Sequence, residues 1–227
     1  PGRFDIFGPN AEVDFFTDAN PSRESYSVYA QTTYSLSDAF RIVSGLRYSE
    51  DTFTTDVTNF LNVESFQEEG TTDEITSRVV AEVDFSEDIM GYFALAKGFK
   101  PGGSNLTFGF DDDNAPPMVF PTFEAETVDS VEFGLKSTFA DGAARANIAV
   151  FSYTYENLQF QATDPDIYRG GVANIPESEM SGLEIEFTGF LSDSLSLDMN
   201  LAFLDSEVTS DYEVLDNVDA YPYFFGE

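Results

Sequence analysis

The sequence contains no cysteine, no histidine and no tryptophan. Without cysteine it can form neither a disulfide nor a thiolate metal site, and without histidine it has neither a Ser-His-Asp triad nor an axial haem ligand. The remaining residue types offer no recognisable pair of nucleophile and base. The sequence therefore predicts a protein that is not an enzyme and that holds no resident metal or other cofactor.

Basic residues are scarce as well. Lys and Arg together number 10 against 42 Asp and Glu, which gives a formal net charge of −32. Nucleic-acid binding requires a basic face, so this balance argues strongly against a nucleic-acid partner. The acidic excess favours a well-solvated exterior, with a high-salt habitat or a cation-collecting surface as alternatives.

Long apolar runs are also absent: no stretch of about 18 apolar residues occurs, so no transmembrane helix is expected. Apolar and polar residues alternate instead, most clearly in a hairpin over Asp129–Phe151. Its turn, residues 140–143, contains Asp-Gly, a strong hairpin signal between two alternating runs. A period of two places the apolar side chains on one face of a β-strand and the polar ones on the other.

The same unit recurs along the chain, with tight turns at nearly equal spacing centred on Asp38, Asp88, Asp141 and Asp193. The predicted strands cover residues 26–36, 40–60, 75–85, 89–100, 129–139, 144–155, 172–188 and 195–203. Loops are expected at residues 1–24, 61–72, 101–123, 164–171 and 210–227. The prediction is one all-β domain, an antiparallel up-and-down meander of about eight long strands within residues 25–209.

Tight turns at one end of the strands and long polar loops at the other are typical of an outer-membrane β-barrel. Strands of about fourteen residues would extend about 46 Å, well beyond the apolar band of about 25 Å in such barrels. A soluble meander or sandwich is the structural alternative, although its strands average about five or six residues. Six aromatic residues are expected near the membrane interfaces: Tyr34, Phe40, Phe85, Phe139, Phe187 and Phe203.

The positions of the first and last predicted strands indicate that the chain is a section of a wider barrel. If the tight turns are periplasmic, the first strand starts and the last strand ends on the extracellular side, whereas free-standing barrels of this class keep both termini in the periplasm. We therefore expect an internal segment that forms an open section of a large transmembrane β-barrel. Pairing between residues 26–36 and 195–203 would instead indicate a barrel closed at eight strands.

Five stretches resemble recurring strands of the TonB-dependent outer-membrane receptors. They occur in that family's order: Val43–Tyr48 (VSGLRY), Gly91–Gly103 (GYFALAKGFKPGG), Glu124–Ser137 (EAETVDSVEFGLKS), Ala149–Gln159 (AVFSYTYENLQ) and Ser181–Glu186 (SGLEIE). The resemblance covers nearly all of the region from Tyr26 to Asp205. No segment like the family's N-terminal plug, TonB box or terminal aromatic strand is seen among these residues.

The resemblance implies a barrel of about 22 strands around a plug, embedded in outer-membrane lipid of the Gram-negative type. It further implies uptake of a scarce small-molecule or metal-chelate ligand, such as a ferric siderophore complex, driven through the TonB complex. Two other functions are considered: a passive porin-like or structural outer-membrane barrel, and a soluble β-rich adhesin or binding module.

Several basic residues fall on the polar face, which would line the lumen. Arg41, Arg47, Arg78 and Lys136 do so by alternation, and Lys97 and Arg145 are expected to join them because a charge facing lipid costs about 2–4 kcal/mol. They could form a basic path for an anionic ligand, or ion pairs that keep the strands in register. The predicted ligand-contact residues are Arg47, Arg78, Lys97, Phe99, Lys100, Phe108 and Phe110.

The acidic run at residues 111–114 lies in the loop predicted at residues 101–123, after the strand at residues 89–100. Neighbouring carboxylates could hold Ca²⁺, but the run lacks the spacing of a known calcium loop. The prediction is a solvated acidic tip rather than a metal site.

Overall fold

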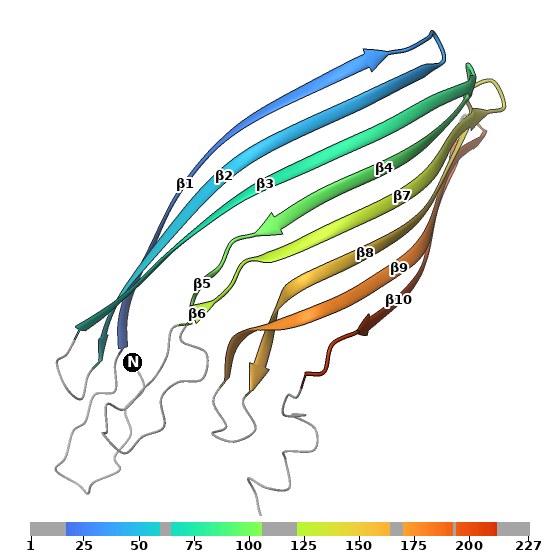
Figure 1. Ribbon diagram of the computed structural model, residues 1–227. Coiled ribbons are helices and arrows are strands. Elements are labelled where there is room, and N and C mark those ends of the chain that lie inside the picture. Colours follow the sequence, from blue (N-terminus) through green and yellow to red (C-terminus); the bar gives the residue numbers. More distant parts are fainter. Residues whose placement is uncertain (1–16, 60–64, 106–121, 164–169, 193, 213–227) are drawn as a thin grey trace, which may run out of the picture.

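The computed structural model describes residues 17–59, 65–105, 122–163, 170–192 and 194–212 (Figure 1). These residues form β-strands joined by turns, and no helix among them is long and apolar enough to cross a membrane. The strands are β1 (Thr17–Ser35), β2 (Phe40–Asn59), β3 (Ser65–Ser86), β4 (Ile89–Lys100), β5 (Gly103–Ser104), β6 (Thr122–Phe123), β7 (Glu126–Phe139), β8 (Ala144–Thr163), β9 (Gly170–Ser192) and β10 (Leu195–Val208).

Eight of these strands form one antiparallel sheet in the order β1-β2-β3-β4-β7-β8-β9-β10, while β5 and β6 form a separate small pair. Each strand of the large sheet therefore pairs with its neighbours in sequence, which confirms the predicted up-and-down meander. The tight turns gather at one end of the curved sheet, and the opposite ends of the strands lead into the segments that the structure does not describe (Figure 1).

The two outer strands of the sheet, β1 and β10, are not paired with each other. Within the described residues β1 bonds only to β2, and β10 only to β9. The sheet is thus open, as predicted for a section of a wider barrel, and the alternative of a barrel closed at eight strands is not supported.

The register separates apolar and polar side chains along every pairing of the sheet. Across β2 and β3, for example, Ile42 is opposite Ala81 and Tyr48 is opposite Ile75, while Arg41 is opposite Glu82. We call the residues whose side chains lie on the apolar face of the sheet the apolar row, and those on the opposite face the polar row. The apolar row includes Val28, Leu46, Val79, Leu95, Phe133, Ile148, Leu183, Leu201 and Phe203.

The apolar row is exposed although it is hydrophobic. Phe85 is 68% exposed and Val28 is 67% exposed, and only a few apolar side chains of the described residues are buried. A single-layer sheet has no opposing layer to cover this face, so it requires an apolar medium. From Phe40 to Tyr48 the apolar row of β2 rises about 27 Å along the strand, or about 20 Å along the barrel axis after a tilt of about 40°.

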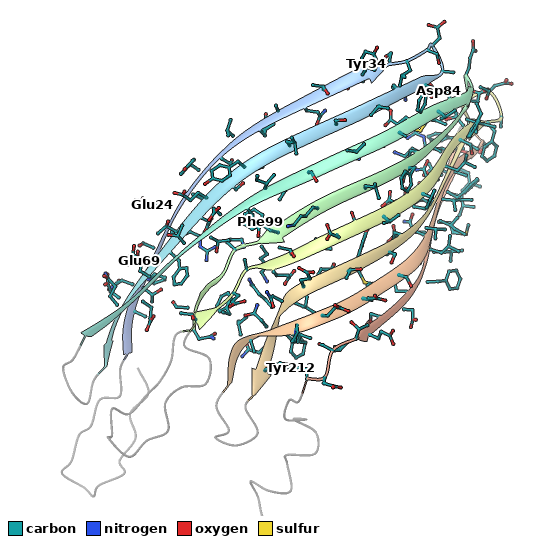
Figure 2. The ribbon with its side chains drawn as sticks, viewed as in Figure 1. Glu24, Tyr34, Glu69, Asp84, Phe99 and Tyr212 are labelled. Atoms are coloured by element: carbon teal, nitrogen blue, oxygen red, sulfur yellow. The ribbon has the colours of Figure 1, made fainter. Side chains whose placement is uncertain are left out.

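The apolar row ends at carboxylates on the side of the long loops. The next outward-facing residue above it is acidic on five strands, and on β9 an acidic residue follows one outward-facing position later, after Ser181: these residues are Glu24, Glu50, Asp73, Asp129, Asp205 and, on β9, Glu179. Figure 2 shows Tyr34 and Asp84 near the tight turns, and Glu24 and Glu69 toward the opposite end. The six predicted interface aromatics all lie in the apolar row.

Strand boundaries extend beyond the predicted ones on the loop side. Residues 1–24 were expected to be a loop, but β1 begins at Thr17; residues 61–72 were expected to be a loop, but β3 begins at Ser65. Above the apolar band neither face must be hydrophobic, so alternation disappears while the backbone hydrogen bonds continue, as between Thr17 and Asn59. Pro21 is compatible with this extension because β1 is an edge strand, where a missing N–H is tolerated.

The tight turns follow the predicted chemistry. At the turn between β7 and β8, Ala140, Asp141 and Gly142 have positive φ values of 55°, 54° and 85°. Between β1 and β2, the Ser37 hydroxyl accepts hydrogen bonds from the N–H groups of Ala39 and Phe40. Asp193, the predicted centre of the fourth turn, lies outside the described residues.

Tyr92 provides a test of packing on the polar row. Its ring lies over Gly134, where an added Cβ would be 2.1 Å from the ring, and its hydroxyl donates to Glu132 at 2.5 Å. We expect Gly134→Ala to displace the ring and destabilise the folded protein by about 1–3 kcal/mol. The urea unfolding midpoint measures this change. Gly45→Ala is the matched control, since its Cβ would meet only the Ala30 carbonyl oxygen at 3.8 Å; equal destabilisation by both variants would contradict the packing.

Arg41 links β2 to β3 near the tight turns. Its guanidinium bonds to Glu82 at 2.5 Å and to Asp84 at 2.6 Å, with all three side chains between about a fifth and a third exposed. Arg41→Gln leaves two carboxylates facing each other, and we expect a loss of about 1 kcal/mol at low salt that shrinks at high salt. Urea unfolding in both buffers measures it, with Arg145→Gln as the control. A salt-independent loss would contradict an electrostatic origin.

Candidate functional site

The candidate site is the middle of the polar row on β1, β2 and β3. Arg47 is opposite Tyr29 on β1 and Thr76 on β3, and Arg78 is opposite Gly45. The two arginines are therefore diagonal neighbours on one face. Gly45, which lies between Arg41 and Arg47 in the polar row of β2, has no side chain and leaves space beside them.

A hollow of about 380 Å³ lies at this position. The polar-row residues that line it are Tyr29, Gln31, Gly45, Arg47, Thr76, Arg78 and Ala96. Tyr29 is 72% exposed, so its ring and hydroxyl are available beside the guanidinium groups. Lys97 lines the hollow as well, so the hollow combines three basic side chains, an aromatic ring and an amide.

The two arginines have no carboxylate partner within the described residues. Arg47 donates from Nε to the Ser49 hydroxyl at 3.1 Å, and Arg78 forms no ion pair. Because acidic residues outnumber basic ones fourfold in this chain, unpaired guanidinium groups are notable. A guanidinium binds carboxylates and other oxyanions through paired N–H groups, so this site can accept an anion.

Two basic residues of the polar row nearer the tight turns, Arg41 and Lys136, have partners. Arg41 bonds to two carboxylates, as predicted by the ion-pair interpretation. The Lys136 ammonium lies 5.3 Å from the centre of the Tyr92 ring, beside a hollow of about 230 Å³ that is lined by Glu132, Glu184 and Glu186. The larger hollow of about 650 Å³ near the tight turns also mixes charges, with Asp84 and Asp88 against Lys136 and Arg145. The Arg47–Arg78 hollow is therefore the more specific candidate.

Lys97 departs from its expected position. The register places it opposite Ser77 and Asp129, in the apolar row with Leu95, not in the polar row. Its ammonium lies 3.5 Å from the Glu74 carboxylate, which it can reach because β3 and β4 stop pairing at Ser77 and Lys97. Because β4 is apolar on both faces, alternation could not decide the register of Lys97, which was predicted for the polar row. Its ammonium nevertheless turns to the polar side, since Glu74 lies in the polar row opposite Ser49, and Lys97 lines the same hollow as Arg47 and Arg78.

The remaining predicted contact residues do not join the hollow. Phe99 follows Lys97 in the apolar row opposite Thr127, and Lys100 is exposed opposite Glu126 (Figure 2). Phe108 and Phe110 lie outside the described residues, as does the acidic run at 111–114. Within the described ranges, no group of three or more acidic side chains is arranged to hold a metal ion. Of the predicted set, the structure brings together Arg47, Arg78 and Lys97 around one hollow, and of these Lys97 is paired with Glu74.

Sequence reasoning overlooked Tyr29. An aromatic residue in an otherwise polar row was the available signal, since Ser25, Ser27, Gln31 and Thr33 are its neighbours on that face. Its place beside Arg47 depends on the register between β1 and β2, which single-strand alternation does not give.

Comparisons with known proteins agree with this architecture. Residues 1–224 match the family model described as TonB dependent receptor-like, beta-barrel. The pesticin receptor of Yersinia pestis is 28% identical over 200 residues, which cover 84% of this chain and 27% of that protein. The probable TonB-dependent siderophore receptor PiuA of Acinetobacter baumannii is 27% identical over 197 residues, covering 85% of this chain and 25% of that protein.

Solved structures give the same fold. The ferric yersiniabactin uptake receptor FyuA from Yersinia pestis superposes with a TM-score of 0.70 at 23% identity, over 86% of this chain and 28% of that one. PiuA from Acinetobacter baumannii gives a TM-score of 0.70 at 21% identity, over 88% of this chain and 28% of that one. The chain thus spans about a quarter of the length of these relatives. With its open meander and its match over almost the whole length, the chain belongs to the TonB-dependent receptor β-barrel family, whose members are transporters and not enzymes.

Proposed function

We propose that this chain forms part of the barrel wall of a Gram-negative outer-membrane receptor that takes up an anionic ferric siderophore complex by TonB-dependent transport. Family membership supports receptor-mediated uptake, and relatives named as siderophore receptors support the ligand class. The exposed apolar row would contact outer-membrane lipid. Coupling to the TonB complex would pass through a plug contributed by the intact receptor.

The observation that carries the proposal is the pair Arg47 and Arg78. These guanidinium groups face the polar side of the sheet, beside a hollow, without a carboxylate partner in the part of the chain that is described. A carboxylate or phenolate group of a metal chelate would neutralise them, whereas a neutral ligand would leave both charges unpaired.

The other predicted residues take secondary roles in this proposal. Lys100, Phe99, Phe108 and Phe110 would contact the ligand closer to the long loops, since β4 leads into the loop that carries the last two. Lys97 already has Glu74 as a partner, so we place Arg47 and Arg78 ahead of it.

We expect Arg47→Gln combined with Arg78→Gln to weaken uptake of an anionic ferric chelate about tenfold, mainly as a higher KM, because two charge-assisted contacts are lost. Uptake is measured with radiolabelled iron in cells that carry the intact receptor and no other iron receptor. The panel contains ferric citrate, a ferric catecholate and a neutral ferric trihydroxamate.

Lys136→Gln combined with Arg145→Gln is the control, because it removes the same two positive charges from the polar row near the tight turns. An equal loss with this control would indicate a general charge effect and not a site. Uptake of the neutral chelate alone would contradict the proposed ligand class.

A further inference from the structure

The strands β5 and β6 occupy a distinct position in the fold. β5 comes shortly after the end of β4, and β6 comes shortly before the start of β7 (Figure 1). β4 and β7 have 12 and 14 residues, whereas the flanking strands β3 and β8 have 22 and 20. Gly103 pairs with Phe123, and Ser104 pairs with Thr122. We call residues 101–105 and 122–125 the shelf.

On the side of β1 to β3, polar-row side chains bind the shelf. Arg23 donates from Nη2 to the Gly102 carbonyl at 2.7 Å, and its Nη1 lies 3.0 Å from the Asp51 carboxylate, whose residue is only 8% exposed. The hydroxyls of Thr55 and Ser104 are 2.7 Å apart. The Asp51 side chain is 10% exposed and the Arg23 side chain 42%, so the pair is sheltered on one side only; Asp51 and the Gly102 carbonyl together orient the Arg23 guanidinium.

On the side of β8 and β9, side-chain amides bind main-chain groups. Asn105 accepts from the Val172 N–H and donates to the Val172 carbonyl, both at 2.8 Å. Asn174 accepts from the Glu124 N–H at 2.7 Å and donates to the Glu124 carbonyl at 3.0 Å. Gln159 donates to the Pro101 carbonyl at 2.9 Å. All three amides therefore link the shelf to the sheet. Asn105 and Asn174 each bond to both the N–H and the carbonyl of one residue, as a paired strand would.

These contacts place the shelf over the polar row. The register puts Arg23, Asp51 and Thr55 on the polar side of β1 and β2. On β9 the buried side chains change from Ser178 to Ile175 and Ala173 across the unpaired Pro176, opposite Asn157 with a φ of 54°. On that side the shelf is therefore located by its hydrogen bonds to Val172, Asn174 and Gln159. The shelf thus crosses the sheet on its inner side, above the ends of β4 and β7. Close packing leaves no free space, since a Cβ at Gly102 would lie 2.5 Å from the Phe123 carbonyl oxygen.

We propose that the shelf is a fixed constriction on the extracellular side of the lumen, which limits the size of the ligand that passes and does not move aside during transport. Asn105, Gln159 and Asn174 are its positioning residues. The transport part of this inference rests on the proposed function, but the position and rigidity of the shelf do not.

The first test measures the rigidity of the shelf without any transport. Thr55 is only 4% exposed and contacts Ser104, whereas Ser22 on the neighbouring β1 is exposed. Because this chain has no cysteine, maleimide labelling of Thr55→Cys and Ser22→Cys can be compared in outer membranes containing the intact receptor. We expect Thr55→Cys to react at least about tenfold more slowly, since labelling requires the shelf to open. Equal rates would overturn the proposal.

Loosening the shelf supplies the matched comparison. Adding Asn105→Ala and Asn174→Ala to Thr55→Cys should raise its labelling about tenfold, because four hydrogen bonds to the sheet are removed. Adding Asn147→Ala should leave labelling unchanged, since that amide bonds to Glu186 on the same face and away from the shelf. The same increase with Asn147→Ala would overturn the role of the amides.

The second test asks whether the shelf moves during transport. Thr55→Cys with Ser104→Cys should form a disulfide in the absence of ligand, and the oxidised receptor should transport iron within about twofold of the reduced one. Failure to form the bond, or loss of uptake that a reductant restores, would overturn the fixed shelf. If even the reduced receptor takes up no ferric chelate, the proposed function fails, while the labelling rates still decide on the shelf.

Discussion

The continuous ladder of backbone hydrogen bonds from β1 to β10 is the interaction on which the rest of this structure depends. The sheet is a single layer with few buried apolar side chains, so it cannot be held together by a packed core. In a membrane each strand must satisfy its polar backbone groups by pairing with its neighbours, because lipid offers no alternative partner. The ladder also fixes the register, and a slip of one residue would exchange the two faces of a strand.

Because the register is fixed, charge in the polar row can be arranged finely. Near the tight turns Arg41 is neutralised by Glu82 and Asp84. Further along the polar row, Arg47 is three positions beyond Arg41 on β2 and Arg78 is two positions beyond Glu82 on β3, and neither has a carboxylate partner among the residues that the structure describes. Above them, Arg23 is used to hold the shelf. The polar face therefore passes from paired charges through the Arg47–Arg78 hollow to the shelf, which is the order that the proposed passage of an anionic ligand would require.

Most of the sheet could be predicted from the sequence because alternation reports directly on a face in contact with an apolar medium. The start of β2 at Phe40 and the start of β8 at Ala144 follow from it, as does the turn at residues 140–143. Prediction failed where that constraint is missing. The extensions at Thr17 and Ser65 lie above the apolar band, and β4 is apolar on both faces, so Lys97 was assigned to the wrong row.

The candidate site was only partly predictable for a related reason. Arg47 and Arg78 could be placed on the polar face from their own strands, but their adjacency to Tyr29 depends on cross-strand register. The shelf depends on contacts between residues 67 positions apart, such as Asn105 and Val172. A contact between residues so far apart in the sequence cannot be predicted from a local sequence pattern.

The central claim is that the register turns one row toward lipid and the other toward the lumen. Spin labels at single cysteine substitutions from Ser130 to Lys136 in β7 of the intact receptor, in lipid vesicles, would test it most directly. The account predicts a period of two, with oxygen accessibility highest at Val131, Phe133 and Leu135, and access to a water-soluble relaxation agent highest at Ser130, Glu132 and Lys136. Accessibility without this alternation, or with the opposite phase, would contradict it.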